Sequence, residues 1–279
     1  MIKKIERADG RLAHQLRPLT VSYNSFGYAD GSVLFSLGNT KVLCAITLQA
    51  GVPAFLKGKK TGWLTAEYSL MPTSTKTRVQ RDSSQKYNGR SIEIARLIGR
   101  SLRTVINLHK LGERTIIVDC DVLQADGGTR TACITAAFLA LRQAVKKWVT
   151  DGVLVESILI DELAAISIGL KNQEVLLDID YAEDSLIDAD YNFVLNRSGS
   201  IVEVQGTTES KAIPWPLFYT MCSVAAEGIK KLFEQLDEIS PNSIEDDVKN
   251  DQSEQPVFLS HTSKGMLNAL TKYHLKLSD

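Results

Sequence analysis

The chain has 279 residues, and 32 Lys and Arg against 33 Asp and Glu give it a formal net charge of −1 at pH 7. Such a length can bury a full core as one large domain or as two closely packed halves. No apolar run is long enough to cross a bilayer, and the N-terminus lacks the apolar core of a signal peptide. The composition therefore excludes a membrane protein, and we expect a cytoplasmic one.

The first predicted elements are a β-hairpin and a basic loop. The hairpin arms are 32–37 and 41–48. Between Lys57 and Arg90, eight basic residues stand against two acidic ones, a net charge of +6. Polar residues fill 73–84, which predicts a mobile loop. Basic loops suit RNA backbones, which they bind through salt-dependent phosphate contacts, although an ordinary solvated loop has the same composition.

The next segment predicts an amphipathic helix that starts with a glycine and an arginine. Gly89-Arg90-Ser91 precedes apolar residues at helical spacing, namely Ile94, Leu97, Ile98, Leu102, Val105 and Ile106. A surface ion pair would also explain Arg90. A cation at a helix start is, however, mildly unfavourable with the helix dipole.

A strand-type run, 115–123, then leads through Leu123-Gln-Ala-Asp-Gly-Gly-Thr-Arg-Thr131 into a predicted helix at 129–149. Glycines allow the backbone to approach a ligand, and the first N–H groups of a helix attract anions. Thr129 is a candidate helix cap, and Arg130 adds a planar cationic donor. The segment predicts a phosphate or phosphodiester site, although a ligand-free strand–helix connection has the same pattern. Two Gly-Arg helix starts that face one cleft would hold a tetrahedral anion from two sides.

Acidic residues follow two further predicted strands, 163–170 and 174–181. They are Glu183, Asp184, Asp188 and Asp190, and a hairpin with arms 191–195 and 200–204 comes after them. Carboxylates at strand ends can hold Mg²⁺, and one of them could act as a general acid. A solvated acidic loop is the alternative that composition alone favours.

The last predicted elements are a helix at 214–239 and an acidic segment. Residues 236–257 carry seven acids and one lysine, a net charge of −6, which is typical of a linker or a disordered segment. Residues 258–277 could form a short helix. Mixed strands and helices with hairpins indicate an α+β fold with βαβ crossovers. The four cysteines, which form no C-x-x-C pair and lie in apolar runs, are expected as buried thiols: Cys44, Cys120, Cys133 and Cys222.

These motifs together resemble the bacterial ribonuclease PH family. The matching segments run in order from near Arg11 to about Glu238, and they include Gly38–Cys44, Gly62–Tyr68, Gly89-Arg90, Cys120–Ala132, Glu183–Ser185, Asp190 and Ile201–Thr207. The resemblance implies two related β-α units with mixed sheets and packed helices. It implies a catalytic domain at 1–240, and it leaves 241–279 as an acidic linker and a short C-terminal extension.

The resemblance also implies roles for particular residues. Gly128, Thr129, Arg130 and Arg90 match the family's phosphate-binding positions, and Asp184 and Asp190 match its active-site carboxylates, which support a divalent metal and proton transfer. It leaves open which carboxylate does which. Resemblance supports Arg78 and Arg81 as RNA-binding positions, and we expect Lys76 to join them. Thr73 stands where the family often has arginine, and Lys76 where histidine is common, so either RNA affinity or its dependence on salt is expected to be lower than typical.

The implied activity is a phosphate-dependent 3′→5′ exoribonuclease that trims tRNA precursors, acts in tRNA and rRNA processing, and releases nucleoside diphosphates. Its cofactor would be Mg²⁺ or Mn²⁺, its co-substrate inorganic phosphate, and its assembly a homo-hexameric ring, a trimer of dimers. Two alternatives remain: a catalytically silent RNA-binding ring subunit, and a metal-dependent hydrolytic nuclease that uses Asp184 and Asp190 with water.

Overall fold

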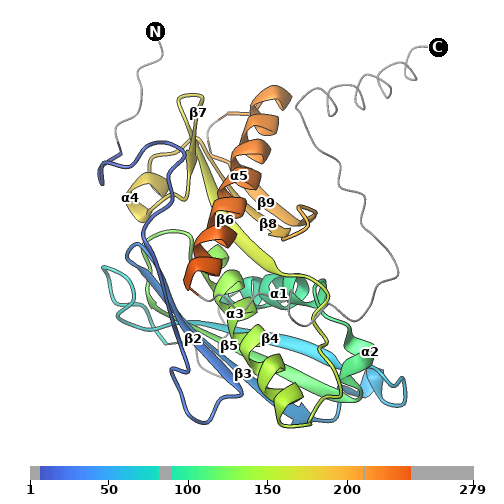
Figure 1. Ribbon diagram of the computed structural model, residues 1–279. Helices are drawn as coiled ribbons and strands as arrows, with labels where there is room; N and C mark the ends of the chain where they lie inside the picture. Colours follow the sequence, from blue (N-terminus) through green and yellow to red (C-terminus); the bar gives the residue numbers. More distant parts are fainter. Residues whose placement is uncertain (1–6, 82–88, 210, 240–279) are drawn as a thin grey trace, which may run out of the picture. The chain divides into compact units, whose positions relative to one another are not determined.

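Two β-sheets, with helices packed against them, form the described part of the computed structural model, which comprises residues 7–81, 89–209 and 211–239 (Figure 1). The first sheet has the strand order β1-β2-β3-β5-β4 and the second has the order β7-β6-β8-β9. This arrangement confirms the predicted α+β class.

The first sheet contains the predicted N-terminal hairpin. Its strands are β1 (Leu19–Tyr23), β2 (Gly31–Leu37), β3 (Thr40–Ala50), β4 (Trp63–Leu70) and β5 (Arg114–Gln124). All neighbouring strands run antiparallel except β4 and β5, which are parallel. Alternate residues of these strands point into the core, as in β5, where Ile116, Val118, Cys120 and Val122 are buried. The helix α1 (Gly89–Arg103) connects the two parallel strands and packs on β4, followed by the short α2 (Leu108–Leu111).

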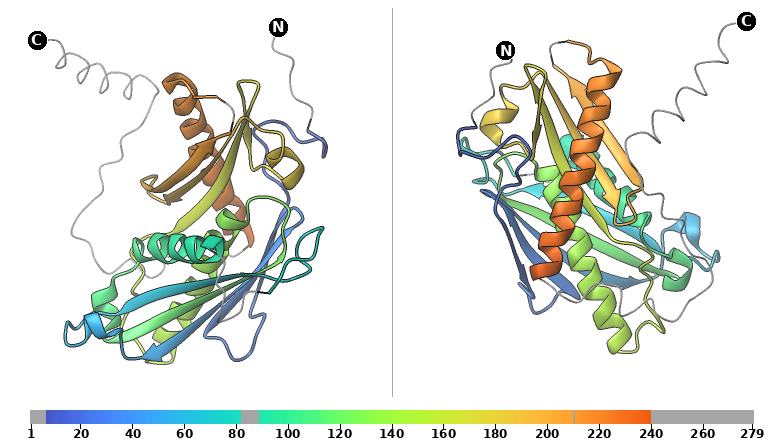
Figure 2. Two further views of the ribbon diagram at one scale, coloured as in Figure 1. Left: turned by 180° about the vertical axis from the view of Figure 1, so that it is seen from behind. Right: turned by 45° about the horizontal axis from the view of Figure 1, so that its top comes forward.

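The helix α3 (Thr129–Thr150) lies between the two sheets, against β2 and β3 of one and β6 of the other (Figure 2). It is buried on nearly every side, which explains its run of small and apolar residues, from Ala132 to Leu141. Because α3 begins at the predicted anion loop, this packing fixes that loop relative to both sheets.

The second sheet comprises β6 (Leu163–Lys171), β7 (Glu174–Leu177), β8 (Ala189–Asn196) and β9 (Ile201–Thr208). Its pairings are all antiparallel, so among the described strands parallel pairing occurs only in the first sheet. The short α4 (Tyr181–Asp184) stands between β7 and β8, and α5 (Trp215–Ile239) packs on β6, β7 and β8.

The structure differs from the predicted strands at two points. The strand predicted to reach Tyr181 ends at Leu177, because Asp178 has a φ of 55° and Asp180 caps α4. The strands β1 and β4 were not predicted. The predicted helix 214–239 is confirmed as α5, so residues 236–239, which also begin the acidic segment, are helical. The rest of the acidic segment, the extension 241–279 and residues 82–84 of the predicted mobile loop lie outside the described residues. In residues 71–81, the part of that loop that is described, there is neither strand nor helix.

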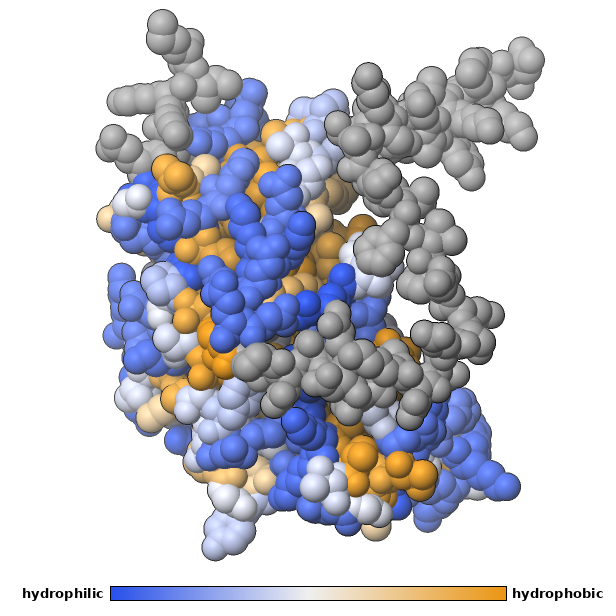
Figure 3. Space-filling model, in the orientation of Figure 1, coloured by the Kyte–Doolittle hydropathy of each residue, from blue (hydrophilic) through white to orange (hydrophobic). Residues whose placement is uncertain are grey.

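The four cysteines are free thiols; Cys44, Cys120 and Cys133 are buried and Cys222 is half-buried. Hydrophobic residues reach the surface in patches between hydrophilic ones on the face drawn in Figure 3. Within the described ranges, no helix combines the length and the apolar character needed to span a membrane.

Candidate active site

A cavity of about 840 Å³ collects most of the predicted site residues. Arg90 at the start of α1 lines it, as do Gly128, Thr129 and Arg130 at the start of α3, and Asp184 and Asp190 from the second sheet. The helices α1 and α3 therefore supply the cations, while the short α4 between β7 and β8 supplies Asp184 and the strand β8 supplies Asp190. The two helix starts that carry Arg90 and Arg130 therefore lie at one cavity.

The loop before α3 is built on two consecutive left-handed glycines, Gly127 (φ 78°) and Gly128 (φ 63°). Gly128 is the N-cap residue of α3, and no side chain caps this helix. The expectation that Thr129 caps the helix is wrong, because Thr129 lies within the first turn and its hydroxyl accepts a hydrogen bond from Tyr68 instead (3.2 Å). Burial raises the pKa of Tyr68 to about 12, so its phenol remains a donor. The first N–H groups of this 22-residue helix therefore have no capping side chain as a hydrogen-bond acceptor.

A buried ion pair stabilises the glycine loop, Gly127-Gly128. Arg17 and Asp178 lie 2.7 Å apart (Nη2 to Oδ1), and both are almost completely buried. Arg17 also donates to the carbonyl of Asp126 (2.6 Å), while Thr40 donates to that of Gly127 (2.6 Å). Burial lowers the pKa of Arg17, but the Asp178 carboxylate outweighs this and holds it above its usual value. The glycine loop is therefore held by a pair of residues on segments far apart in the chain.

Arg130 is oriented by a carboxylate on α1. Its Nη2 donates to Glu93 (3.0 Å), and Gln205 of β9 donates to the other oxygen of Glu93 (2.8 Å). Burial raises the pKa of Glu93, but hydrogen bonds from Gln205 and Arg130 lower it below its ordinary value. The Nε of Arg130 is buried and has no hydrogen-bond partner among the described residues. Buried donors are normally satisfied, so this nitrogen marks a place for an acceptor that the chain itself does not supply.

The carboxylate side of the cavity is held by a capped turn. The side chain of Asp180 accepts from the backbone of Glu183 (2.8 Å), and Glu183 accepts from that of Asp180 (3.0 Å), which is a capping box. Arg7 pairs with both oxygens of Glu183, at 2.6 and 2.7 Å. The turn therefore presents Asp184 from a fixed backbone.

Asp184 is close to charges of both signs. Burial and the charge of Asp190 raise the pKa of Asp184, and the nearby charges of Arg90 and Arg130 oppose this rise. Two carboxylates that repel each other next to two guanidinium groups can hold a cation or share a proton, and they can do so beside a bound anion.

The described part of the basic loop, residues 71–81 (the basic segment), runs along one side of the cavity. Thr75 and Val79 line it, whereas the three predicted RNA-binding residues, Lys76, Arg78 and Arg81, are exposed outside it, as is Thr73. Lys76 lies over the ring of Tyr181, with its Nζ 5.5 Å from the ring centroid. The loop therefore forms part of the cavity wall, while its exposed cations do not line the cavity.

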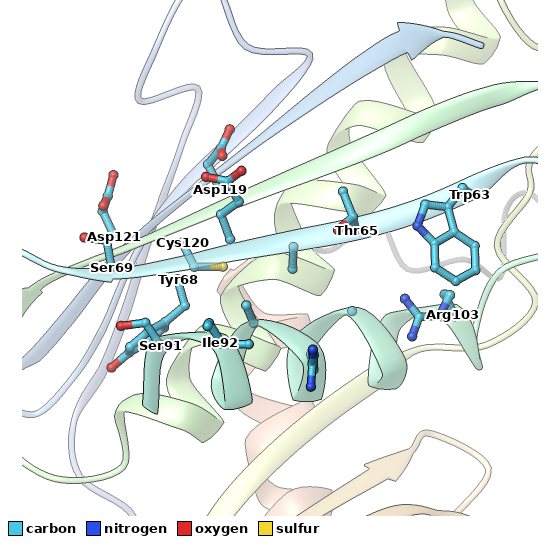
Figure 4. Close-up of a pocket in the computed structure, with 15 residues that line it drawn as sticks. Trp63, Thr65, Tyr68, Ser69, Ser91, Ile92, Arg103, Asp119, Cys120 and Asp121 are labelled. Carbon is cyan, nitrogen blue, oxygen red and sulfur yellow. The ribbon is translucent and has the colours of Figure 1, made fainter. Parts of the chain in front are cut away.

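A second cavity, of about 690 Å³, lies between α1 and the strands β4 and β5 (Figure 4). Arg103 covers one end of it, over the ring of Trp63 at 4.5 Å, and donates to the carbonyl of Leu64 (2.9 Å). Asp119 and Asp121 lie at its other end (Figure 4). None of Arg90, Arg130, Asp184 and Asp190 lines this cavity, so it is not the predicted site. No group of three or more His, Cys, Asp or Glu residues suited to a metal ion occurs among the described residues.

Sequence reasoning missed several residues that build the site, namely Arg7, Arg17, Thr40, Tyr68, Glu93, Asp178 and Gln205. Glu93 stands one helical turn after Arg90, a spacing at which helical side chains are neighbours, so it could have been considered. The pairing of Arg17 with Asp178 had no such signal, since 161 residues separate them.

Comparison with known proteins places these features in one family. A model of the "3' exoribonuclease family, domain 1" matches residues 15–147, and one of its domain 2 matches residues 161–228. Ribonuclease PH of Neisseria meningitidis is 48% identical over 225 residues, which cover 80% of this chain and 93% of that protein. Ribonuclease PH of Bacillus velezensis is 48% identical over 235 residues, covering 84% and 96% respectively.

Solved structures share the fold at lower sequence identity. A chain of the Archaeoglobus fulgidus exosome with RNA bound to the active site superposes with a TM-score of 0.71 at 24% identity, covering 83% of this chain and 92% of that one. Rrp46 of rice, Oryza sativa, gives a TM-score of 0.66 at 20% identity, covering 82% and 97%. At these identities the likeness concerns the fold alone.

Proposed function

This chain belongs to the 3′ exoribonuclease family and is a phosphorolytic 3′→5′ exoribonuclease, and we propose that it trims the 3′ ends of tRNA precursors. The observation that carries the proposal is the single cavity into which two arginines at helix starts and two carboxylates open. Phosphorolysis brings two anions together, so it needs such a surplus of donors on one side and a proton source on the other.

Inorganic phosphate would bind at the start of α3. The N–H groups of Gly128, Thr129 and Arg130 belong to the uncapped helix end, which attracts anions. The guanidinium of Arg130 adds charge-assisted hydrogen bonds, and its unpartnered Nε supports this assignment. Arg90 would hold the anion from the opposite helix start. Glu93 keeps the guanidinium of Arg130 turned toward this position.

A divalent ion, Mg²⁺ or Mn²⁺, would be held by Asp184 and Asp190. The fit rests on the repulsion between these carboxylates, which a cation would relieve. Mg²⁺ needs only one or two carboxylates when water and substrate phosphate complete its shell, which agrees with the absence of a denser cluster among the described residues. When bound, the metal would supply charge neutralisation at the reacting phosphates.

In the reaction, an oxygen of inorganic phosphate attacks the phosphorus of the last phosphodiester bond. The bond from that phosphorus to the O3′ of the preceding nucleotide breaks, a proton passes to O3′, and a nucleoside diphosphate leaves. The arginines hold the attacking phosphate and stabilise charge on the pentacoordinate phosphorus, while one of the two carboxyl groups, Asp184 or Asp190, would act as the general acid toward O3′.

The RNA backbone would follow the basic segment. Lys76, Arg78 and Arg81 are exposed beside the cavity, and their loop contributes Thr75 and Val79 to its wall. We further propose a homo-hexameric ring, a trimer of dimers, and a domain organisation with catalysis confined to 1–240.

The test is a product analysis. A short RNA with a tRNA-like 3′ end is incubated with Mg²⁺, with and without phosphate, and the products are separated by mass. Nucleoside diphosphates that form only with phosphate support the proposal, and the Asp190→Asn variant should then lose them. Monophosphates formed without phosphate would indicate hydrolysis. No release of nucleotides from either mixture would indicate a silent RNA-binding subunit. A tRNA precursor and an unrelated RNA of equal length then test the substrate preference.

A further inference from the structure

Tyr181 presents an exposed aromatic ring at the catalytic cavity. The residue lines the cavity, is 53% exposed, and precedes Asp184 by three residues on the same short helix, α4. Single exposed aromatic residues are common on protein surfaces, but this ring stands at the wall of the reaction cavity, where a bound substrate can reach it. The reaction described above uses Asp184 and leaves this ring without a role.

The backbone under this ring is fixed. Asp180, directly before Tyr181, caps the turn, and Arg7 locks Glu183 in place. The glycine loop also packs on the entry to the turn, because a Cβ on Gly127 would lie 2.6 Å from the carbonyl oxygen of Ile179. A ring carried by such a turn is preorganised, so a ligand that contacts it loses little free energy in ordering it.

The cations around the ring favour a planar ligand with negatively charged groups next to it. Lys76 lies over the ring at 5.5 Å, and its loop carries Arg78 and Arg81. Arg90 and Arg130 line the same cavity. A nucleobase flanked by backbone phosphates fits this pattern. Stacking on an aromatic ring is also tolerant of sequence, since every base has a π-face, and an exonuclease must accept successive bases of any kind.

We propose that Tyr181 is a stacking platform for a nucleobase at the 3′ end of bound RNA, with Lys76 contacting the neighbouring backbone phosphate. This inference rests on the proposed function, because it assumes that the cavity receives an RNA 3′ end. It adds a base-binding subsite to a site otherwise built for phosphates and metal.

The experiment compares Tyr181→Ala and Tyr181→Phe on two RNAs. One is a short single-stranded RNA, and the other is the same RNA with abasic riboses at its last two positions. Tyr181→Ala should raise the KM for the normal RNA roughly 5- to 150-fold, the range of a lost base–aromatic stack. Tyr181→Phe keeps the ring and should retain the wild-type KM. On the abasic RNA, wild type and Tyr181→Ala should be alike, and the KM for phosphate should not change in either variant.

Leu186→Ala is the matched control, because Leu186 is 64% exposed on the same connection but does not line the cavity. An equal penalty for Tyr181→Ala on both RNAs, or no penalty on either, would overturn the stacking role. Affinities for the two RNAs in phosphate-free buffer repeat the comparison without catalysis. A chain that releases no diphosphate would refute the proposed activity, and the affinities would still decide on stacking.

Discussion

Arg90 and Arg130 reach the cavity from the second position of their helices, yet their settings differ. Arg130 is half-buried and held by Glu93, whereas Arg90 is exposed at the start of α1. A charged hydrogen bond contributes roughly 1.5 to 3 kcal/mol, which corresponds to roughly 10- to 150-fold in affinity. Arg90→Ala should therefore raise the KM for phosphate by about this factor, and Arg130→Ala should abolish phosphorolysis.

Steady-state kinetics at varied phosphate concentration measure both effects. Arg100→Ala is the control on the same helix, because Arg100 pairs with Glu203 and does not line the cavity. Wild-type phosphate dependence in the Arg130 variant would remove this arginine from the phosphate site.

Asp119 lies in the second cavity and gives a pH-dependent prediction. Burial, followed by the charge of Glu67, raises the pKa of Asp119 to about 6 from 3.8. The folded state thus binds this proton more tightly than the unfolded state, so ionisation of Asp119 costs stability as the pH rises through about 4 to 6. Asp119→Asn should raise the Tm above pH 6, and the gain should shrink toward pH 4.

Thermal unfolding across this pH range checks the sign. The exposed Glu227 on α5 offers a control, Glu227→Gln, which should show no such trend. A Tm gain that stays constant from pH 4 to pH 7 would contradict the raised pKa.

At the scale of elements, the glycine loop depends on contact with the turn before α4. Gly127→Ala would place a Cβ 2.6 Å from backbone atoms of both Ile179 and Asp180, which cannot give way as a flexible side chain can. A Cβ on Gly128 would instead meet the end of the Arg17 side chain at 3.1 Å. We expect Gly127→Ala to destabilise the fold more than Gly128→Ala, and to lower kcat by shifting the loop.

The Gly152→Ala variant measures the cost of a left-handed backbone to the free energy of unfolding, without any steric contact. Gly152 also has a positive φ, 71°, but its Cβ would meet nothing within 4 Å. It should therefore show only the left-handed penalty of roughly 1 to 2 kcal/mol. Chemical unfolding of the three variants ranks these costs, and a Gly127 variant no less stable than the Gly152 variant would argue against the loop–turn contact.

The N-terminal segment 7–17 also holds the turn that carries Asp184. Arg7 is 5% exposed and joins Glu183 to the carbonyl of Leu177 (2.8 Å). Breaking a buried ion pair from one side costs about 3 to 5 kcal/mol, because the other charge is left without its partner. Arg7→Met should be destabilising by this order and should lower kcat more than the affinity for phosphate, since it loosens the turn that carries Asp184.

The double variant Arg7→Met, Glu183→Gln provides the control. If the two residues act as a pair, it should be less destabilised than the sum of the single variants, as contacting residues are when measured in a double-mutant cycle. Strict additivity of the unfolding free energies would mean that Arg7 acts through its carbonyl contacts alone.

At the scale of the whole molecule, charge is distributed unevenly although the net charge is only −1. The basic segment lies beside the cavity, and salt-dependent RNA binding should follow from it. Arg78→Ala and Arg81→Ala should each flatten the slope of log affinity against log salt by about 0.7, the value for one phosphate contact of a single strand. The exposed Lys230 on α5 serves as the control, Lys230→Ala. Unchanged slopes in both arginine variants would exclude this segment from the RNA path.

One half of the fold contributes the arginines of the site and the other half contributes the carboxylates. The sequence alone predicted both groups of residues. Glycine followed by arginine before helix-type runs predicted the two helix starts, and acids after a strand predicted the carboxylates, because periodicity and end signals are local. The sequence also indicated the α+β class, the second hairpin and α5.

Only the tertiary structure decided how these parts meet. The length of β7 was mispredicted because Asp178, in a left-handed conformation, turns inward to pair with Arg17. Thr129 was misassigned as a cap because its hydroxyl faces Tyr68 of β4, a strand that the sequence did not reveal. Glu93 and Gln205 meet at Arg130 although 112 residues separate them. These contacts arise because α3 packs between the sheets, and a pattern within one segment carries no information about which distant segment will lie against it.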